Sequence, residues 1–175
     1  MVDSKLADKT GPSTEQPTAG GGSTMRMVVA ALGIALAVGL AGASDQTDVT
    51  ATVNRFIDSM NKGDVKAAVT TCATPSAIID EFPPYGWQGA TACADWATDF
   101  DTFNKKNGIT DAVATLGKPR HLDITGDRAY AVIPATYTYK QKGKKVVESG
   151  STLTAALRKI ERWGWVITGW AWSKH

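Results

Sequence analysis

The sequence predicts an α+β domain in which helices come first and a curved antiparallel sheet follows. Two observations support this fold class. Apolar residues recur at helical spacing between residues 48 and 106, whereas β-branched and aromatic residues fill the chain after Gly108 in runs that turn signals interrupt. A third observation separates the domain from the start of the chain. Residues 1–24 are polar and rich in Ser, Thr, Gly and Pro, which predicts a disordered leader or a start codon assigned too early.

The segment 25–43 has the composition of a secretory signal peptide. Arg26 precedes an uncharged run of 17 residues that ends at Ala43, and small residues stand where a signal peptidase inspects the chain. Cleavage is expected between Ala43 and Ser44. The alternative is an uncleaved anchor, but 17 helical residues span only about 25 Å of a hydrocarbon core about 30 Å thick. Either way the domain, residues 44–175, is expected outside the cytoplasm, periplasmic or secreted, with no stable membrane insertion after cleavage.

Helical signals open the domain. Apolar residues at steps of three and four predict a first helix over residues 48–61, and Gly63 stands where a helix ends. Asp64 is expected to cap a short second helix whose inner face reaches Cys72, until Pro75 forbids its continuation. These two helices are expected to form a hairpin.

A strand, a loop and a third helix follow. Residues 77–82 predict a brief strand, and Pro-Pro-Tyr-Gly at 83–86 predicts an extended loop. The third helix is predicted over residues 90–106, with its stop at Asn107-Gly108. It completes a set of three helices before the sheet.

Four or more antiparallel strands are predicted after Gly108, because turn signals at 125–127, 142–144 and 163–164 separate the β-type runs. Pro134 cannot donate to a strand ladder, so we expect a bulge or bend in the long strand that contains it. A bent strand makes a curved sheet. Helices on its concave face would enclose a cone with an aromatic lining, which is a natural pocket for a small molecule.

Two stretches of the domain resemble a known superfamily. VNRFIDSMNKGD, from Val53 to Asp64, is similar to a first helix and N-x-G-D turn, and the tail from Tyr137 to Trp172 is similar to long closing hairpins. Together they resemble the nuclear transport factor 2-like superfamily, in particular its SnoaL-like and ketosteroid isomerase-like branch. The resemblance covers residues 48–173. It implies a cone-shaped fold, but it says little about activity, since isomerases, dehydratases, hydrolases, cyclases and binding modules share this scaffold.

In steroid isomerases an Asp acts as the base, and a Tyr and a protonated Asp on the opposite side hold the enolate oxygen. The resemblance allows these positions to be compared with this sequence. It places Asp80 at the base, Phe56 at the tyrosine position and Thr152 near the second acid. Neither Phe56 nor Thr152 is a strong acidic donor. Standard steroid isomerase activity is therefore disfavoured.

Asp80 is the strongest catalytic candidate, because a carboxylate among apolar neighbours can have a raised pKa and act as a base. His121 and Tyr137 are candidate proton donors to accompany it, and Tyr85 is a further one. The alternatives are a loop carboxylate that faces water for Asp80, and a surface or packed side chain for the others.

The candidate pocket residues are mostly aromatic, and core or dimer-interface packing is the alternative for each of them. They are Phe56, Phe82, Tyr85, Trp87, Trp96, Asp99, Phe100, Thr152 and Trp170.

A disulfide between Cys72 and Cys93 is predicted, because an exported chain meets an oxidising compartment and these are its only cysteines. The bond would enclose the loop that carries Asp80 and would stabilise the fold by about 3 kcal/mol. The alternative is two buried thiols.

Several function classes are excluded. The net charge of +2 comes without a polybasic tract, so nucleic-acid binding is not expected. The Cys and His spacing gives no metal site, and the sequence lacks the Gly-rich loops of nucleotide cofactors, so no metal and no cofactor are expected.

The sequence therefore predicts an exported domain that binds a small, largely apolar molecule in a conical pocket. The first alternative is a cofactor-independent isomerase or lyase, such as a dehydratase, with Asp80 as general base. The second is an interaction domain with a filled cone that forms a homodimer through its sheet.

Overall fold

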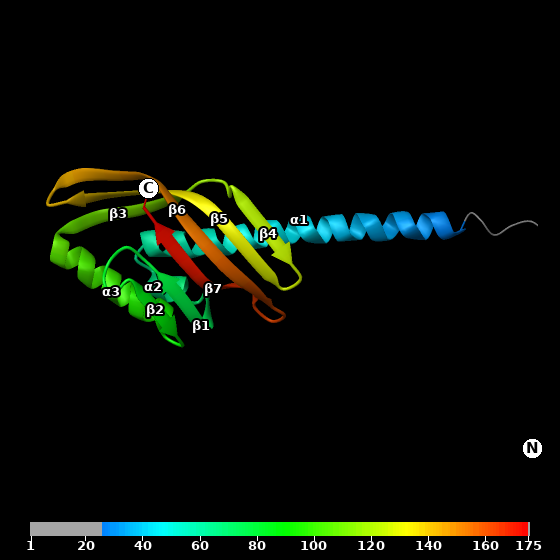
Figure 1. The fold of residues 1–175 in the computed structure, drawn as a ribbon, viewed down its shortest axis with the longest axis horizontal. Coiled ribbons are helices and arrows are strands. Elements are labelled where there is room, and N and C mark those ends of the chain that lie inside the picture. The colour runs from blue at the N-terminus through cyan, green and yellow to red at the C-terminus, as the bar shows by residue number, and fades with distance from the viewer. Residues whose placement is uncertain (1–25, 175) are drawn as a thin grey trace, which may run out of the picture. The chain divides into compact units, whose positions relative to one another are not determined.

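The computed structural model describes the backbone of residues 26–174 and the side chains of residues 44–174 (Figure 1). The predicted leader, residues 1–24, lies outside the described residues. The chain divides into two compact units, Met1–Ala37 and Val38–His175, and the second carries the fold discussed below. Among the described residues, no helix is both long and apolar enough to cross a membrane.

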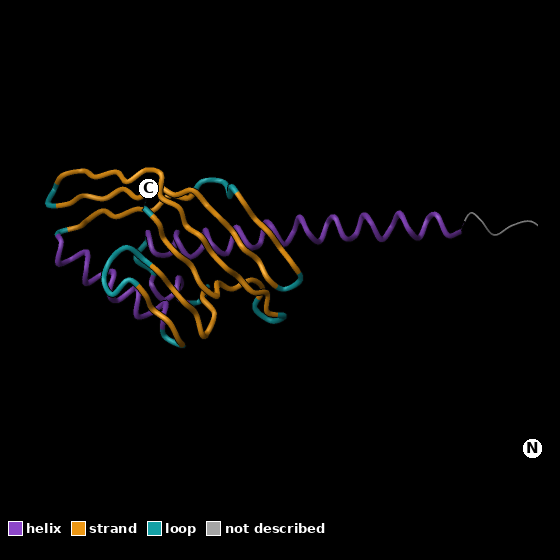
Figure 2. The backbone as a smooth tube through the Cα atoms, viewed as in Figure 1, coloured by secondary structure: helices purple, strands orange, loops and turns teal. Residues whose placement is uncertain are grey.

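Three helices and seven strands make up the described chain (Figure 2). The helices are α1 (Arg26–Asn61), α2 (Val65–Val69) and α3 (Ala92–Asn107). The strands are β1 (Cys72–Ile79), β2 (Gly86–Gly89), β3 (Ile109–Leu116), β4 (His121–Thr125), β5 (Arg128–Gln141), β6 (Lys144–Ile160) and β7 (Gly164–Ser173). This order of helices and strands confirms the predicted α+β class.

The strands form one curved, unclosed sheet in the order β2-β1-β7-β6-β5-β3, with β4 paired to β5 beside this path. Neighbours are antiparallel except β1 and β7, which run parallel. The prediction of a wholly antiparallel sheet is therefore wrong at this pair. Turn signals fix the direction of consecutive strands, whereas β1 joins β7 from a distant part of the chain and no hairpin constrains its direction.

The second helix is shorter than predicted. Asp64 caps it as expected, accepting a hydrogen bond from the Ala67 backbone N–H at 3.0 Å, but α2 ends at Val69. Cys72 is the first residue of β1, because the Thr71 carbonyl already accepts a bond from β7. Pro75 lies inside this strand, at a shift of register with β7 where a missing N–H is tolerated.

The long strands β5 and β6 contain the predicted irregularity. Their register shifts between Ala135 and Thr136, next to Pro134. Ala135 pairs with Ser151 and Thr136 pairs with Ser149, so the extra residue is Gly150 on β6, at φ +84°. Glycine adopts this left-handed conformation without a steric penalty, which lets the hairpin bend.

The described part of α1 packs one face on the sheet. Val49, Val53 and Phe56, at helical spacing, are at most 2% exposed and belong to the hydrophobic core. Gly108 ends α3 in the left-handed conformation, as predicted. The predicted elements are thus correct where a cap or turn residue defined their ends.

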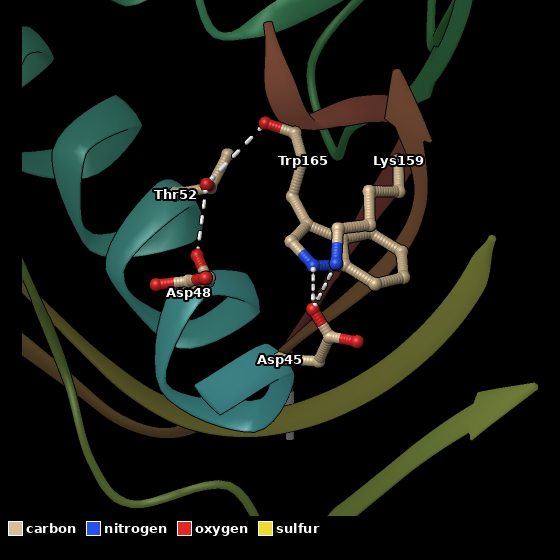
Figure 3. Close-up of polar contacts among 5 residues, drawn as sticks. All are labelled: Asp45, Asp48, Thr52, Lys159 and Trp165. Atoms are coloured by element: carbon tan, nitrogen blue, oxygen red, sulfur yellow. Dashed lines mark hydrogen bonds and ion pairs between the residues drawn. The ribbon is translucent and has the colours of Figure 1, made fainter. Parts of the chain in front are cut away.

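Polar contacts anchor α1 to β6 and β7 (Figure 3). Asp45 Oδ1 accepts hydrogen bonds from Lys159 Nζ at 2.5 Å and Trp165 Nε1 at 3.2 Å, and these bonds hold the pKa of Asp45 below its ordinary value. Thr52 Oγ1 donates to the Asp48 carbonyl at 2.9 Å and lies 3.4 Å from the Trp165 carbonyl. The anchor therefore joins segments more than 100 residues apart.

Candidate functional site

A cavity of about 290 Å³ is lined by residues of α1, α3 and strands β3, β5, β6 and β7, and by the loop after β1. Nine aromatic side chains line it: Phe56, Phe82, Trp96, Phe100, Phe103, Tyr137, Tyr139, Trp170 and Trp172. The polar lining residues are Asn61, Asp80, Glu81, Asn104, Asn107, Gln141, Glu148 and Lys174. A cavity lined mainly by aromatic and aliphatic side chains, with a smaller number of polar groups, is the usual form of a small-molecule site.

Packed aromatic rings give the cavity a firm wall. Trp96 stacks on Phe100, with ring centroids 5.2 Å apart, and meets Trp170 edge-on at 4.8 Å. Phe56 contacts Trp96 and Trp170, with centroids 5.8 Å apart in each pair. Rings in such tilted and stacked arrangements stabilise one another beyond the area they bury. We infer that this wall is preorganised.

Asp80 follows the last residue of β1 and lines the cavity, with only 9% of its surface exposed. Its Oδ1 accepts a hydrogen bond from the Glu81 backbone N–H at 2.7 Å, and its Oδ2 accepts one from Trp96 Nε1 at 2.8 Å. Burial raises the pKa of Asp80 to about 6, although both hydrogen bonds favour the charged form. A carboxylate with this pKa can accept and return a proton near neutral pH.

Tyr137 on β5 places a hydroxyl among the aromatic rings. Its ring lies 5.0 Å from that of Tyr139 and 6.5 Å from that of Phe100. Burial raises the pKa of Tyr137 above its ordinary value, and the charge of Asp80 adds to the effect. The hydroxyl therefore stays protonated at neutral pH and remains a hydrogen-bond donor.

Four residues that the sequence did not indicate form a polar group at the cavity. Lys174, close to the C-terminus, pairs with Glu81 Oε1 at 3.0 Å and with Glu148 Oε1 at 3.2 Å. Tyr139 donates its hydroxyl proton to the same Glu148 oxygen at 2.8 Å. These residues come from the loop after β1, from β5, from β6 and from the end of β7. No sequence spacing links such distant positions.

Seven of the predicted site residues line the cavity. They are Phe56, Asp80, Phe82, Trp96, Phe100, Tyr137 and Trp170.

Three predicted pocket residues lie outside the lining. Tyr85 is 58% exposed in the turn before β2. Trp87 is buried, but its Nε1 donates a hydrogen bond to Asp99 Oδ2 at 2.8 Å. The two side chains are therefore hydrogen-bonded to each other, and neither lines the cavity.

Two further candidates also lie outside the cavity. Thr152 alternates with Leu153 along β6, and Leu153 occupies the cavity face. His121 lies on β4, where its Nε2 is 2.7 Å from Asp123 Oδ2 and its side chain is 54% exposed. His121 is therefore not placed to exchange a proton with a molecule in the cavity.

The predicted disulfide is present between Cys72 and Cys93. It joins the start of β1 to the first turn of α3, so it closes the segment that contains Asp80 and Phe82. Within residues 44–174, no three His, Cys, Asp or Glu side chains gather in a way that would hold a metal ion.

Solved structures share this fold. A nuclear transport factor 2-like protein with a cystatin-like fold from Novosphingobium aromaticivorans has a TM-score of 0.66 at 16% identity, over 79% of this chain and 87% of its own. A nuclear transport factor 2-like superfamily protein from Salmonella enterica has a TM-score of 0.64 at 18% identity, over 76% and 92% of the two chains. A ketosteroid isomerase-like protein from Erwinia carotovora atroseptica has a TM-score of 0.59 at 17% identity, over 73% and 94%.

The chain therefore has the nuclear transport factor 2-like fold, as the sequence resemblance implied. No protein-family profile matches the sequence, and no curated protein matches it. The fold is shared by proteins of many activities, so function has to be argued from the cavity itself.

Proposed function

We propose that this protein binds a small, largely apolar molecule in the cavity. One observation carries the proposal. In the described part of the chain six buried side-chain polar atoms lack a hydrogen-bond partner, and four of them belong to cavity-lining residues: Asn104 Oδ1, Tyr137 Oη, Glu148 Oε2 and Trp170 Nε1. Buried polar atoms nearly always have partners in native proteins. A ligand with matching polar groups would supply them.

The cavity volume limits the size of this ligand. An apolar protein cavity of about 150 Å³ accommodates benzene. The cavity here, at about 290 Å³, has room for a molecule of one or two rings. This is consistent with the aromatic lining, which favours a flat apolar body.

Export belongs to the same proposal. The disulfide is compatible with an oxidising compartment, where such bonds form and persist. The signal peptide over residues 25–43, with cleavage between Ala43 and Ser44, stays a prediction. Sequencing the N-terminus of the protein recovered from the periplasm or medium of its host would test it.

Blocking the cavity tests the binding function. Ala112→Trp introduces a large side chain into the lining, and we expect it to weaken binding of the neutral probe 2-naphthol by at least about tenfold, because the ring would occupy the ligand's volume. Tryptophan fluorescence of the purified protein measures this affinity. Val113→Trp changes the adjacent residue, which is 43% exposed outside the lining, and is expected to bind like the wild type. Equal binding by both variants, or none by the wild type, would contradict the proposal.

A second candidate function is cofactor-independent proton transfer in the same cavity. The observation that favours it is that one cavity is lined both by a buried carboxylate, Asp80, whose pKa is raised to about 6, and by the protonated hydroxyl of Tyr137. In such a reaction the Asp80 carboxylate would take a proton from carbon next to a carbonyl. Tyr137 would then donate a hydrogen bond to the enolate oxygen.

Deuterium exchange distinguishes catalysis from binding. With the wild type in D₂O, we expect the α-protons of a bound small ketone to exchange for deuterium. NMR would measure the exchange rate for each member of a panel of enolisable ketones. Asp80→Asn is expected to slow this exchange by about 10²-fold or more, because the base is lost. The same variant should keep its affinity for 2-naphthol within a few-fold. If no ketone exchanges faster with the wild type than with Asp80→Asn, the proposal that Asp80 acts as a general base is contradicted.

The predicted homodimer through the sheet also stays a proposal. Val113 on β3 and Val147 on β6 are 43% and 54% exposed, and both pair with Thr138 of the strand between them. The two exposed valines thus flank Thr138 on one face of the sheet, which supports an interface on this face.

A further inference from the structure

The charges around the cavity are unbalanced. Its lining contains three carboxyl groups, those of Asp80, Glu81 and Glu148, and one ammonium group, that of Lys174. The lining contains neither arginine nor histidine. We propose that the ligand is a protonated amine with an apolar body of one or two rings. This inference rests on the binding function proposed above and specifies its ligand class.

Glu148 is the residue that most directly favours an amine as the ligand. Its Oε1 is saturated by the Tyr139 hydroxyl at 2.8 Å and the Lys174 ammonium at 3.2 Å, whereas its Oε2 is buried without a partner among the described residues. A buried carboxylate oxygen is costly unless an N–H or O–H group donates to it. An ammonium group brings three donors and no acceptor, so it satisfies this oxygen and offsets the charge in one contact.

Lys174 does not meet this need by itself. Its ammonium is shared between Glu81 and Glu148, and its side chain is 54% exposed, so much of it faces water. Asp80 forms no ion pair within residues 44–174, and both of its hydrogen-bond donors are neutral groups. The lining thus retains uncompensated negative charge when Asp80 is ionised.

The aromatic lining suits the same ligand. The faces of Trp, Tyr and Phe rings attract a cation, most strongly where water is excluded. Among the unpartnered atoms of the described lining residues, Trp170 Nε1 is the one that is purely a donor, and its residue is 6% exposed. It would donate a hydrogen bond to an ether, hydroxyl or carbonyl oxygen elsewhere on the same molecule.

Nearby lysines do not reverse this electrostatic preference. Four lysines flank lining residues in sequence, but none of them lines the cavity: Lys105, Lys106, Lys140 and Lys142. Lys105 pairs with Asp101 at 2.6 Å, and Lys140 pairs with Asp111 at 2.8 Å. An anionic ligand would instead meet the three carboxyl groups at close range, where like charges repel.

Three probes with one phenylbutyl body test the inference on the wild-type protein. They are the cation 4-phenylbutylamine, the neutral 4-phenylbutan-1-ol and the anion 4-phenylbutanoate, titrated by calorimetry at pH 7.5. We expect the amine to bind at least about tenfold more tightly than the alcohol, and the carboxylate most weakly. An alcohol that binds as tightly as the amine would overturn the amine assignment and leave the binding function standing. If none of the three binds, both fail.

Glu148→Gln then identifies the group responsible. This variant is expected to lower the affinity for the amine by about tenfold and to leave the alcohol within about twofold, because only the charge at the carboxylate changes. Unchanged alcohol binding also shows that the variant is folded. Glu161→Gln, in the exposed turn between β6 and β7, is the matched control and should bind all three probes like the wild type. Amine affinity that is equal in the wild type and Glu148→Gln would contradict the role of Glu148.

Discussion

Reduction of the disulfide between Cys72 and Cys93 is expected to lower the free energy of unfolding by about 3 kcal/mol, because the bond removes loop entropy from the unfolded chain. The two cysteines are 21 residues apart, and the segment between them contains three lining residues, Asp80, Glu81 and Phe82. Urea unfolding of the protein with and without a thiol reductant measures the change. The hydrophobic core around α3 would remain, so we expect the reduced protein to fold with lower stability.

A double variant provides the control for this experiment. Cys72→Ala with Cys93→Ala should be less stable than the oxidised wild type and should show no further response to the reductant. The loss then belongs to the bond and not to a solvent effect. A difference below about 1 kcal/mol between the oxidised and reduced wild type would mean that the unfolded chain is already restricted in this segment.

Titration of Asp80 is expected to lower the stability of the wild type by about 2 kcal/mol as the pH rises from 4 to 7. Its pKa is about 6 in the folded state, against an ordinary value of 3.8. Between these values the folded state retains a proton that the unfolded state has released, so raising the pH favours unfolding. The contribution of Asp80 to stability is fully present below pH 3.8 and is lost as the pH passes through about 6.

Asp80→Asn isolates this effect from other titrating groups. The variant cannot ionise at this position, so the difference in unfolding free energy between it and the wild type should change by about 2 kcal/mol in its favour between pH 4 and pH 7. Asp99→Asn removes another carboxylate that accepts an indole N–H, from Trp87, while retaining Asp80. It should show the same fall as the wild type. If the difference in unfolding free energy between Asp80→Asn and the wild type stayed constant across this pH range, the pKa of Asp80 would not be raised in the folded state.

Part of the candidate site was predictable because four of its nine aromatic lining residues lie on helices with clear periodicity. Phe56 follows the apolar face of α1, and Trp96 and Phe100 are four residues apart on α3. Asp80 was predictable as a carboxylate between apolar residues. Except for Asp99 on α3, the failures arose on strands and in turns. Thr152 and Leu153, for example, are neighbours, and only the strand's orientation decides which of them faces the cavity.

The polar half of the site was not predictable from sequence. Glu148, Lys174 and Glu81 are far apart along the chain and follow no motif. They meet because β7 pairs with β1 on one side and β6 on the other, which brings Lys174, the residue after β7, between two carboxylates. A parallel strand pair made this arrangement, and no turn signal specifies such a pair.

The sequence by itself determined the α+β class, the ends of the helices at Asp64 and Gly108, the turns of the later strands and the disulfide. Each of these depends on interactions within a few residues, such as a cap or a left-handed glycine, or on the presence of only two cysteines in the chain. The tertiary structure decided which residues line the cavity and which charges meet there. Those outcomes depend on strand register and on the pairing of distant strands, because a shift of one residue turns every side chain of a strand to its other face.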